Sequence, residues 1–424
     1  MDLIVALLIL FGVARLAGEG MERIHQSPML GEVFAGILLG PMLLGLIDPN
    51  PATDPGASLN VVATLGIFVL VLLAGIELGR EGLRQAVQER SIVVAAVEFV
   101  LPFTLGYVFA QVLAFNLTQS LFLATAMAVT ALPVSVRILL DLNLLHSRLG
   151  RAIVSVALAN DLVAFGMLGL VVAFMEVGGA PPAATAGFIV LKILLFVGLI
   201  LCVGMILKRT ASSTDGRHSP MERLLGRLKG QESAFAITVT LALLLGAAAE
   251  AVGIHFAVGV FYAGVLVTPQ LVGREEFNQI RRSMSAVSFG LLTPIFFGYI
   301  GLRFAFSLAD WPLVVAVTGL AFAGKLLGGL LGGFVAGFRG APLIALGVGL
   351  NARGMMELLL AQVGLATGII DADLYSALII MTIVTTFCTP PLLKRLLKRF
   401  TVKDVLPAAA QAALAKTGGS NGGP

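Results

Sequence analysis

The chain has 424 residues, of which 58% are hydrophobic and 12% charged, and its mean hydropathy is +0.98. Soluble globular domains are about 25% charged, so this composition excludes a water-soluble protein and indicates a polytopic membrane protein. The 28 Lys and Arg outnumber the 24 Asp and Glu, but they are spread over short connections rather than gathered in one patch. We therefore expect a lipid bilayer and no nucleic acid as partner.

Residues 3–18 lack a basic start and a small-residue cleavage site, which predicts a retained helix rather than a signal peptide. From there on, apolar runs long enough to cross about 30 Å of hydrocarbon as helices follow one another along the chain. The fold class predicted is an all-α polytopic membrane protein with about 13 transmembrane helices. The predicted spans are 3–18, 28–47, 58–78, 91–114, 118–140, 149–175, 185–207, 231–252, 254–270, 285–304, 311–337, 341–365 and 372–397.

The basic residues are distributed unevenly between the two sides of these spans. Lys192, Lys325 and Arg353 fall within spans, and Arg303 lies in an even-numbered connection. All other Lys and Arg lie in or beside the odd-numbered connections or in the tail. The positive-inside rule then predicts a cytoplasmic-membrane protein with its N-terminus outside and its C-terminus in the cytoplasm.

The longest internal connection, 208–230, is basic and polar, and we interpret it as a linker between two halves. Residues 1–400 are predicted to form one membrane domain, made of repeats over about 1–207 and 231–400. The remaining residues, 401–424, end in Gly and Ser. They predict a short cytoplasmic tail that is partly disordered.

A repeated motif supports the two halves. The second span contains AGILLGP, with Gly36 and Pro41, and the ninth contains AGVLVTP, with Gly264 and Pro269, 228 residues later. An offset of seven helices is odd, so the second copy would be inverted relative to the membrane. Inverted repeats of this kind build many secondary transporters.

Two spans at the same offset contain residues that break helices. The fifth reads AVTALPVSVRI around Thr130 and Pro133, and the twelfth reads ALGVGLNARGMMELLL, with Gly349, Asn351 and Gly354 near its centre. Proline removes a donor and clashes with the preceding turn, while glycine tolerates non-helical backbone. Two discontinuous helices are expected, with free carbonyls and helix ends able to face a cation; simple kinks are the alternative.

Asp161, in the stretch ALANDLVAFGML, is the leading candidate for the ion-binding residue. An ionised carboxylate at the bilayer centre costs about 2.5–3.5 kcal/mol even on permissive scales, so it is kept where it meets water, a cation or a partner charge. Such a carboxylate can release a proton and take up a metal cation in its place. The neighbouring Asn160 either packs helices or steadies the site, but it cannot carry a proton.

Three further charged residues lie inside spans. Lys325 is expected to form an ion pair that stabilises the broken helices, and the sequence leaves open whether its amine titrates. Arg353 and Glu357 are four residues apart, a spacing that permits a local salt bridge. Glu98 is also deep enough to face Lys325 or Arg353.

No enzyme signature is present. The sequence has no Walker-type loop, no C-x-x-C and no H-E-x-x-H motif. We therefore expect neither a cofactor nor enzymatic activity. The two cysteines lie in apolar spans and behave as small hydrophobes, and the four histidines, at connections or span ends, are interpreted as solvated.

Four stretches carry a resemblance to a known family: SPMLGEVFAGILLGPMLLG (27–45), LVLLAGIELGREGLR (70–84), LGRAIVSVALANDLVAF (149–165) and ALGVGLNARGMMELLLA (345–361). They resemble the cation:proton antiporter superfamily, closest to its Kef and NapA-like branch. The resemblance implies an NhaA/NapA-like antiporter fold with two crossed discontinuous helices. It also implies a homodimer with interleaved core and dimerisation subdomains and an elevator-like movement.

Carried onto this sequence, the resemblance places the family's ion-binding aspartate on Asp161 and its neighbour on Asn160. It places the broken-helix site on Thr130 and the basic core residue on Lys325. Electrogenic members resemble an Asp-Asp pair, whereas the Asn-Asp pair here is similar to electroneutral exchangers, although those usually have Arg in place of Lys325. We therefore expect electroneutral exchange of Na⁺ or K⁺ for H⁺, with Asp161 binding the transported cation. The alternatives are a Kef-like potassium efflux module, a channel-like cation pathway and an organic-anion symporter.

Overall fold

The computed structural model describes residues 2–53, 56–86, 89–141, 144, 147–175, 183–211, 233–307 and 310–397. All regular secondary structure in these ranges is helical. Most of the predicted linker 208–230 and the whole predicted tail 401–424 lie outside the described residues.

Each predicted span contains a helix, and the four spans around Gly36, Thr130, Gly264 and Asn351 contain only short ones. The helices are α1 (Leu3–Arg23), α2 (Pro28–Leu39), α3 (Gly56–Ala86), α4 (Glu89–Val112), α5 (Leu117–Ala128), α6 (Leu132–Asp141), α7 (Arg148–Met175), α8 (Ala183–Ala211), α10 (Ser233–Ala251), α11 (Phe256–Leu266), α12 (Pro269–Val272), α13 (Arg274–Val287), η1 (Ser288–Leu292), α14 (Thr293–Leu302), α15 (Trp311–Val335), α16 (Gly340–Gly349), α17 (Met355–Ala366) and α18 (Ala372–Leu397).

Eight stretches of the described chain are long and apolar enough to cross a membrane as single helices. The shorter apolar helices include α2 and α11, and the pairs α5–α6 and α16–α17. The number of membrane crossings, about 13, remains a sequence-based prediction.

The boundaries of two spans differ from the prediction. The helix expected over 28–47 ends at Leu39, because Gly40 takes an extended conformation and Pro41 follows it. The span expected to start at residue 285 is preceded by α13 and continues from it through the π-helical turn η1 into α14. Alpha-helical hydrogen bonding resumes around Pro294, whose ring nitrogen cannot donate.

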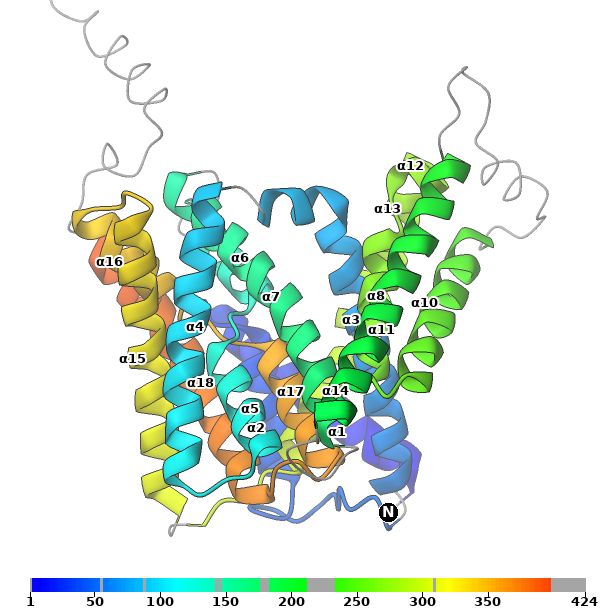
Figure 1. Cartoon of the computed structure of the whole chain (residues 1–424). Helices are drawn as coiled ribbons and strands as arrows, with labels where there is room; N and C mark the ends of the chain where they lie inside the picture. Colours follow the sequence, from blue (N-terminus) through cyan, green and yellow to red (C-terminus); the bar gives the residue numbers. More distant parts are fainter. Residues whose placement is uncertain are drawn as a thin grey trace, which may run out of the picture.

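The helices form two groups that meet at α7 (Figure 1). In the first group, α4 packs on α5 and α15, and α16, α17 and α18 pack around them. In the second, α2 packs on α1 and α14, and α11 packs on α3 and α10. Figure 1 shows α4, α15 and α16 on one flank and α8, α10 and α11 on the other. Helix α7 contacts α4, α5 and α6 on one side and α3 and α11 on the other.

Glycines set the closest approaches in the second group. A Cβ atom at Gly31 would lie 2.2 Å from the Ala17 carbonyl oxygen, and one at Gly259 would lie 2.0 Å from the Leu245 carbonyl oxygen. Both members of the second contact stand 228 residues after those of the first, the offset of the AGxxxxP motif. The two helix pairs, α1–α2 and α10–α11, therefore pack through equivalent positions.

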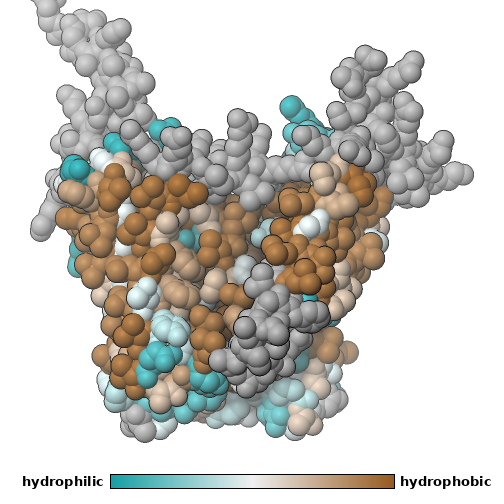
Figure 2. Space-filling view, in the orientation of Figure 1, coloured by the Kyte–Doolittle hydropathy of each residue, from teal (hydrophilic) through white to brown (hydrophobic). Residues whose placement is uncertain are grey.

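The outer surface of the helices is apolar. In Figure 2, hydrophobic residues cover the flank of the molecule and hydrophilic ones gather toward its lower end. Large side chains exposed on the long helices include Leu8 (69%), Leu65 (54%), Leu244 (64%) and Leu331 (53%). Such a band is costly in water and matches the hydrocarbon of a bilayer.

Candidate functional site

A stripe of glycines brings α4 and α15 into close contact. Gly324, Gly328 and Gly332 occur at every fourth residue of α15 and face the α4 backbone. A Cβ atom at Gly328 would lie 2.9 Å from the Glu98 Cα atom, and the other two would lie 3.0 Å from Cα atoms of α4. Small residues at such spacing let helix backbones approach closely in membranes. This approach places the side chains next to the stripe, Glu98 and Lys325, within reach of each other.

Glu98 and Lys325 form a fully buried ion pair. The Lys325 Nζ atom lies 2.6 Å from Glu98 Oε1, and both side chains have 0% exposure. The same carboxylate accepts hydrogen bonds from Thr130 Oγ1 at 2.9 Å and from Asn160 Nδ2 at 2.5 Å. Lys325 also donates to Thr130 Oγ1 at 2.6 Å. Four polar side chains from α4, α7, α15 and the α5–α6 break therefore form one buried network.

The two predicted breaks are present and touch each other. The first separates α5 from α6 at 129–131, and Pro133 lies in the first turn of α6, where a proline is tolerated. The second separates α16, which ends at Gly349, from α17, which begins after Gly354. The Ala131 amide donates to the Ala352 carbonyl at 3.0 Å, and Thr130 Oγ1 donates to the Leu350 carbonyl at 3.2 Å. These bonds hold the two breaks together at a crossing.

Two cationic side chains satisfy the free carbonyls at the end of α5. Arg353 donates to the carbonyls of Ala126 at 3.0 Å and Met127 at 2.7 Å, and Lys325 donates to the Ala128 carbonyl. The C-terminal end of a helix carries a partial negative charge, which cations stabilise. The break therefore needs both Lys325 and Arg353 as structural partners.

The predicted contact between Arg353 and Glu357 is present as a buried ion pair. The Arg353 carbonyl also accepts a hydrogen bond from Thr386 Oγ1 of α18 at 2.7 Å. Asn351, in the same break, donates to the Gly347 carbonyl at 3.1 Å, while its Oδ1 atom is buried without a partner in the described part of the chain.

Asp161 differs from the other buried carboxylates beside the breaks. It lies in α7 and is 8% exposed, and its Oδ1 atom has no hydrogen-bond partner among the described residues. Lys325 is close enough to attract it electrostatically, but no ion pair joins Asp161 to any described residue. Asp161 therefore has a carboxylate oxygen available to a ligand.

Sequence reasoning gave Glu98 too little weight. It was considered only as a possible neighbour of Lys325 or Arg353, and the structure selects Lys325. The available signal was its position: Glu98 and Lys325 are 227 residues apart, nearly the repeat offset, so they occupy similar places in the two halves.

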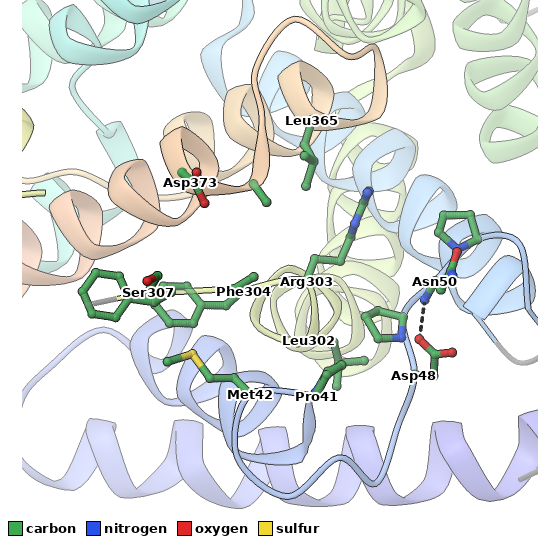
Figure 3. Close-up of a pocket in the computed structure, with 15 residues that line it drawn as sticks. Pro41, Met42, Asp48, Asn50, Leu302, Arg303, Phe304, Ser307, Leu365 and Asp373 are labelled. Carbon is green, nitrogen blue, oxygen red and sulfur yellow. Dashed lines mark hydrogen bonds between the residues drawn. The ribbon is translucent and has the colours of Figure 1, made fainter. Parts of the chain in front are cut away.

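A cavity of about 640 Å³ opens where α2 and α14 end and α18 begins (Figure 3). Arg303, the one basic residue predicted on the outer side, lines it together with Asp48 and Asp373. In Figure 3 the carboxylate of Asp48 accepts from the Asn50 backbone and is not paired with Arg303.

Comparison with known proteins identifies the family. The model of the transmembrane sodium/hydrogen exchanger family matches residues 5–399. The Na⁺/H⁺ antiporter NhaS4 of Synechocystis is 30% identical over 412 residues, covering 92% of this chain and 96% of the relative. The Na⁺/H⁺-K⁺ antiporter GerN of Bacillus cereus is 27% identical over 383 residues, covering 90% and 92%.

A solved structure supports the fold. The sodium proton antiporter MjNhaP1 of Methanocaldococcus jannaschii aligns with a TM-score of 0.68 over 93% of this chain and 97% of that one, at 16% identity. The matched family model and the full-length relatives lead to the same conclusion: this chain belongs to the sodium/hydrogen exchanger family of monovalent cation:proton antiporters.

Proposed function

We propose that the protein is a secondary antiporter that exchanges Na⁺ or K⁺ for H⁺ at Asp161. The observation that carries this proposal is the buried Asp161 carboxylate, whose Oδ1 atom lacks a partner in the described chain next to two crossed helix breaks. A proton or a monovalent cation can neutralise this group, but both cannot do so together. Competition for one carboxylate couples the two flows. Two similar proteins, NhaS4 and GerN, are named as antiporters of these ions.

The charge balance of the site supports one-for-one exchange. Glu98 is paired with Lys325, and Glu357 with Arg353, so each pair contributes no net charge. Asp161 is then the one buried charge of this group left uncompensated. Binding of either H⁺ or a monovalent cation brings the site to neutrality, so the moving part would carry the same charge in both directions.

The neighbouring residues have supporting roles in this proposal. Thr130 and Asn160 hold the Glu98 carboxylate in place, and Lys325 stays charged because Glu98 lies against it. Lys325 therefore contributes no transported proton. Hydrated Na⁺ and K⁺ both take oxygen ligands, and the choice between them depends on the size and field of the cavity.

The movement proposed is an elevator-like shift of the first helix group, which holds both breaks, against the second group, which would form the dimer interface of a homodimer. The proposal is supported by the division of the contacts into two groups joined at α7. It is also supported by the equivalent glycine contacts of α1–α2 and α10–α11, which fit two inverted repeats.

Flux measurement in proteoliposomes tests the function. With a pH gradient imposed, addition of Na⁺ or K⁺ should dissipate the gradient for the wild type and not for Asp161→Asn. Asp2→Asn, at the exposed start of α1, is the matched control and should behave as the wild type. Retained exchange in Asp161→Asn would overturn the role of that residue.

The same preparation separates the alternatives. A channel-like pathway would pass cations without dissipating the pH gradient. A rate that changes when valinomycin and K⁺ set the membrane potential would contradict one-for-one Na⁺/H⁺ exchange.

A further inference from the structure

A cavity of about 420 Å³ lies between the α1–α2 turn and the two helix breaks. It is lined at one end by Arg15 and Glu22 of α1 and at the other by Val134 and Met355. Val134 is in the first turn of α6, and Met355 is the first residue of α17. The cavity therefore runs from the side of the α1–α2 turn, which the Lys and Arg distribution predicts to be cytoplasmic, to the crossing of the breaks.

Glu32 of α2 lines this cavity and is 3% exposed. Its carboxylate makes no hydrogen bond and no ion pair with any residue that the structure describes. The charged groups that act on it are Arg15, which attracts it, and Glu22, which repels it. Arg15 is an exposed residue, and its guanidinium is not within the 4 Å of an ion pair with Glu32. A buried carboxylate left without a direct partner is costly, so a ligand or water is expected at this position.

The local packing makes room for the Glu32 side chain. Gly18 of α1 faces it, and a Cβ atom at Gly18 would lie 3.3 Å from Glu32 Cγ and 3.4 Å from Oε1. Two hydroxyl-bearing residues, Ser27 and Thr293, line the same cavity. Carboxylate and hydroxyl oxygens are the ligands that alkali cations and hydrated cations take in proteins.

We propose that Glu32 forms a second, peripheral binding site for a monovalent cation, which holds the ion in this cavity before it reaches Asp161. This inference rests on the proposed antiporter function for its role in transport, although the binding of a cation does not depend on turnover. A negative charge in a narrow cleft with low-dielectric walls raises the local concentration of cations. Glu32 therefore increases the apparent affinity for the cation on this side of the membrane only.

The first test compares Glu32→Gln with Glu19→Gln, a variant of a half-exposed carboxylate on α1 outside the cavity. For Glu32→Gln we expect the apparent KM for Na⁺ or K⁺ on the α1–α2 side to rise about tenfold, the order that such focusing produces, with the maximal rate little changed. The KM on the opposite side should stay as in the wild type, as should both values for Glu19→Gln. An unchanged KM, or an equal rise on both sides, would overturn the proposal.

The second test does not depend on transport. Ser27→Cys is introduced into a Cys202→Ser/Cys388→Ser background, which removes both native cysteines, and its rates of modification by a cationic and an anionic methanethiosulfonate are compared. We expect the cationic reagent to react faster, Na⁺ to slow it, and both effects to vanish on adding Glu32→Gln. Equal rates with Glu32 intact would overturn the proposal. If these effects hold but the wild type exchanges no ions, the antiporter proposal fails and the cation site stands.

Discussion

The Glu98 carboxylate lies 2.6 Å from the Lys325 ammonium, with both side chains fully buried. Removing one partner of such a pair leaves an uncompensated buried charge, which costs about 3–5 kcal/mol. We expect Glu98→Gln to lower the free energy of unfolding by that amount. Glu98→Gln/Lys325→Met should cost much less than the sum of the single changes, because no lone charge remains. Thermal unfolding in detergent, arranged as a double-mutant cycle, measures this coupling, and additive effects would contradict it.

The carboxylate should be transferable from Glu98 to position 160. Asn160 Nδ2 lies 2.5 Å from Glu98 Oε2, so an aspartate at 160 would stand close to the same ammonium. Asn160→Asp alone adds an uncompensated negative charge, and we expect its exchange to depend on membrane potential. Asn160→Asp/Glu98→Gln restores the charge balance and should exchange without voltage dependence. Flux at clamped potentials distinguishes the two; identical voltage responses would contradict the charge-balance argument.

Arg353 should be less replaceable than its partner Glu357. Arg353 donates to the Ala126 and Met127 carbonyls as well as to Glu357, so Arg353→Gln leaves helix-end carbonyls and a carboxylate without donors. Glu357→Gln keeps an acceptor oxygen for the guanidinium. We expect Arg353→Gln to lower the unfolding temperature more than Glu357→Gln, and Arg353→Lys to rescue only part, since an ammonium lacks the planar fork. Equal losses in the two Gln variants would show that the carbonyl contacts contribute little.

The helices were predictable because each span had to be apolar over its whole length, and Thr130, Pro133 and Gly354 marked where two of them break. The Arg353–Glu357 pair was predictable because both residues lie on one helical segment at a fixed spacing. The Glu98–Lys325 pair was not, because it joins residues 227 positions apart through the packing of α4 on α15. That packing depends on backbone distance at Gly328, which a sequence does not state.

The network around Glu98 also changes the meaning of Asn160. From the sequence, this amide indicated a site with one carboxylate fewer. In the structure it is a donor to a carboxylate supplied by another helix, so the charge is moved and paired rather than lost.

Glycine contacts between helices allow a matched test of packing. A Cβ atom at Gly36 would lie 1.9 Å from the Gly298 carbonyl oxygen, and one at Gly264 would lie 2.4 Å from the Leu72 carbonyl oxygen. These contacts are with backbone atoms, which cannot turn away. We expect Gly36→Ala and Gly264→Ala to lower the unfolding temperature, while Gly12→Ala, with nothing within 4 Å, should leave it unchanged or raise it. A neutral Gly36→Ala would contradict the close packing of α2 on α14.

His255, in the turn between α10 and α11, should not act as a pH sensor of transport. Its Nδ1 atom accepts from the Ala257 amide at 3.3 Å at the start of α11, which requires the neutral ring. Burial lowers the pKa of the His255 imidazole from 6.5 to about 4, so the folded protein keeps it neutral at physiological pH. The pH profile of exchange should therefore be the same in His255→Asn, whose side chain can also cap the helix.

Stability should nevertheless depend on this histidine in acid. Above pH 6.5 the ring is neutral in both the folded and unfolded chain, and its contribution to stability is fully present. As the pH falls from 6.5 toward 4, the unfolded chain binds a proton that the folded chain does not, and that contribution is lost. Unfolding temperatures measured from pH 8 to pH 4.5 should fall more steeply for the wild type than for His255→Asn. Parallel curves would show that the ring titrates alike in both states, which is incompatible with the buried, neutral cap.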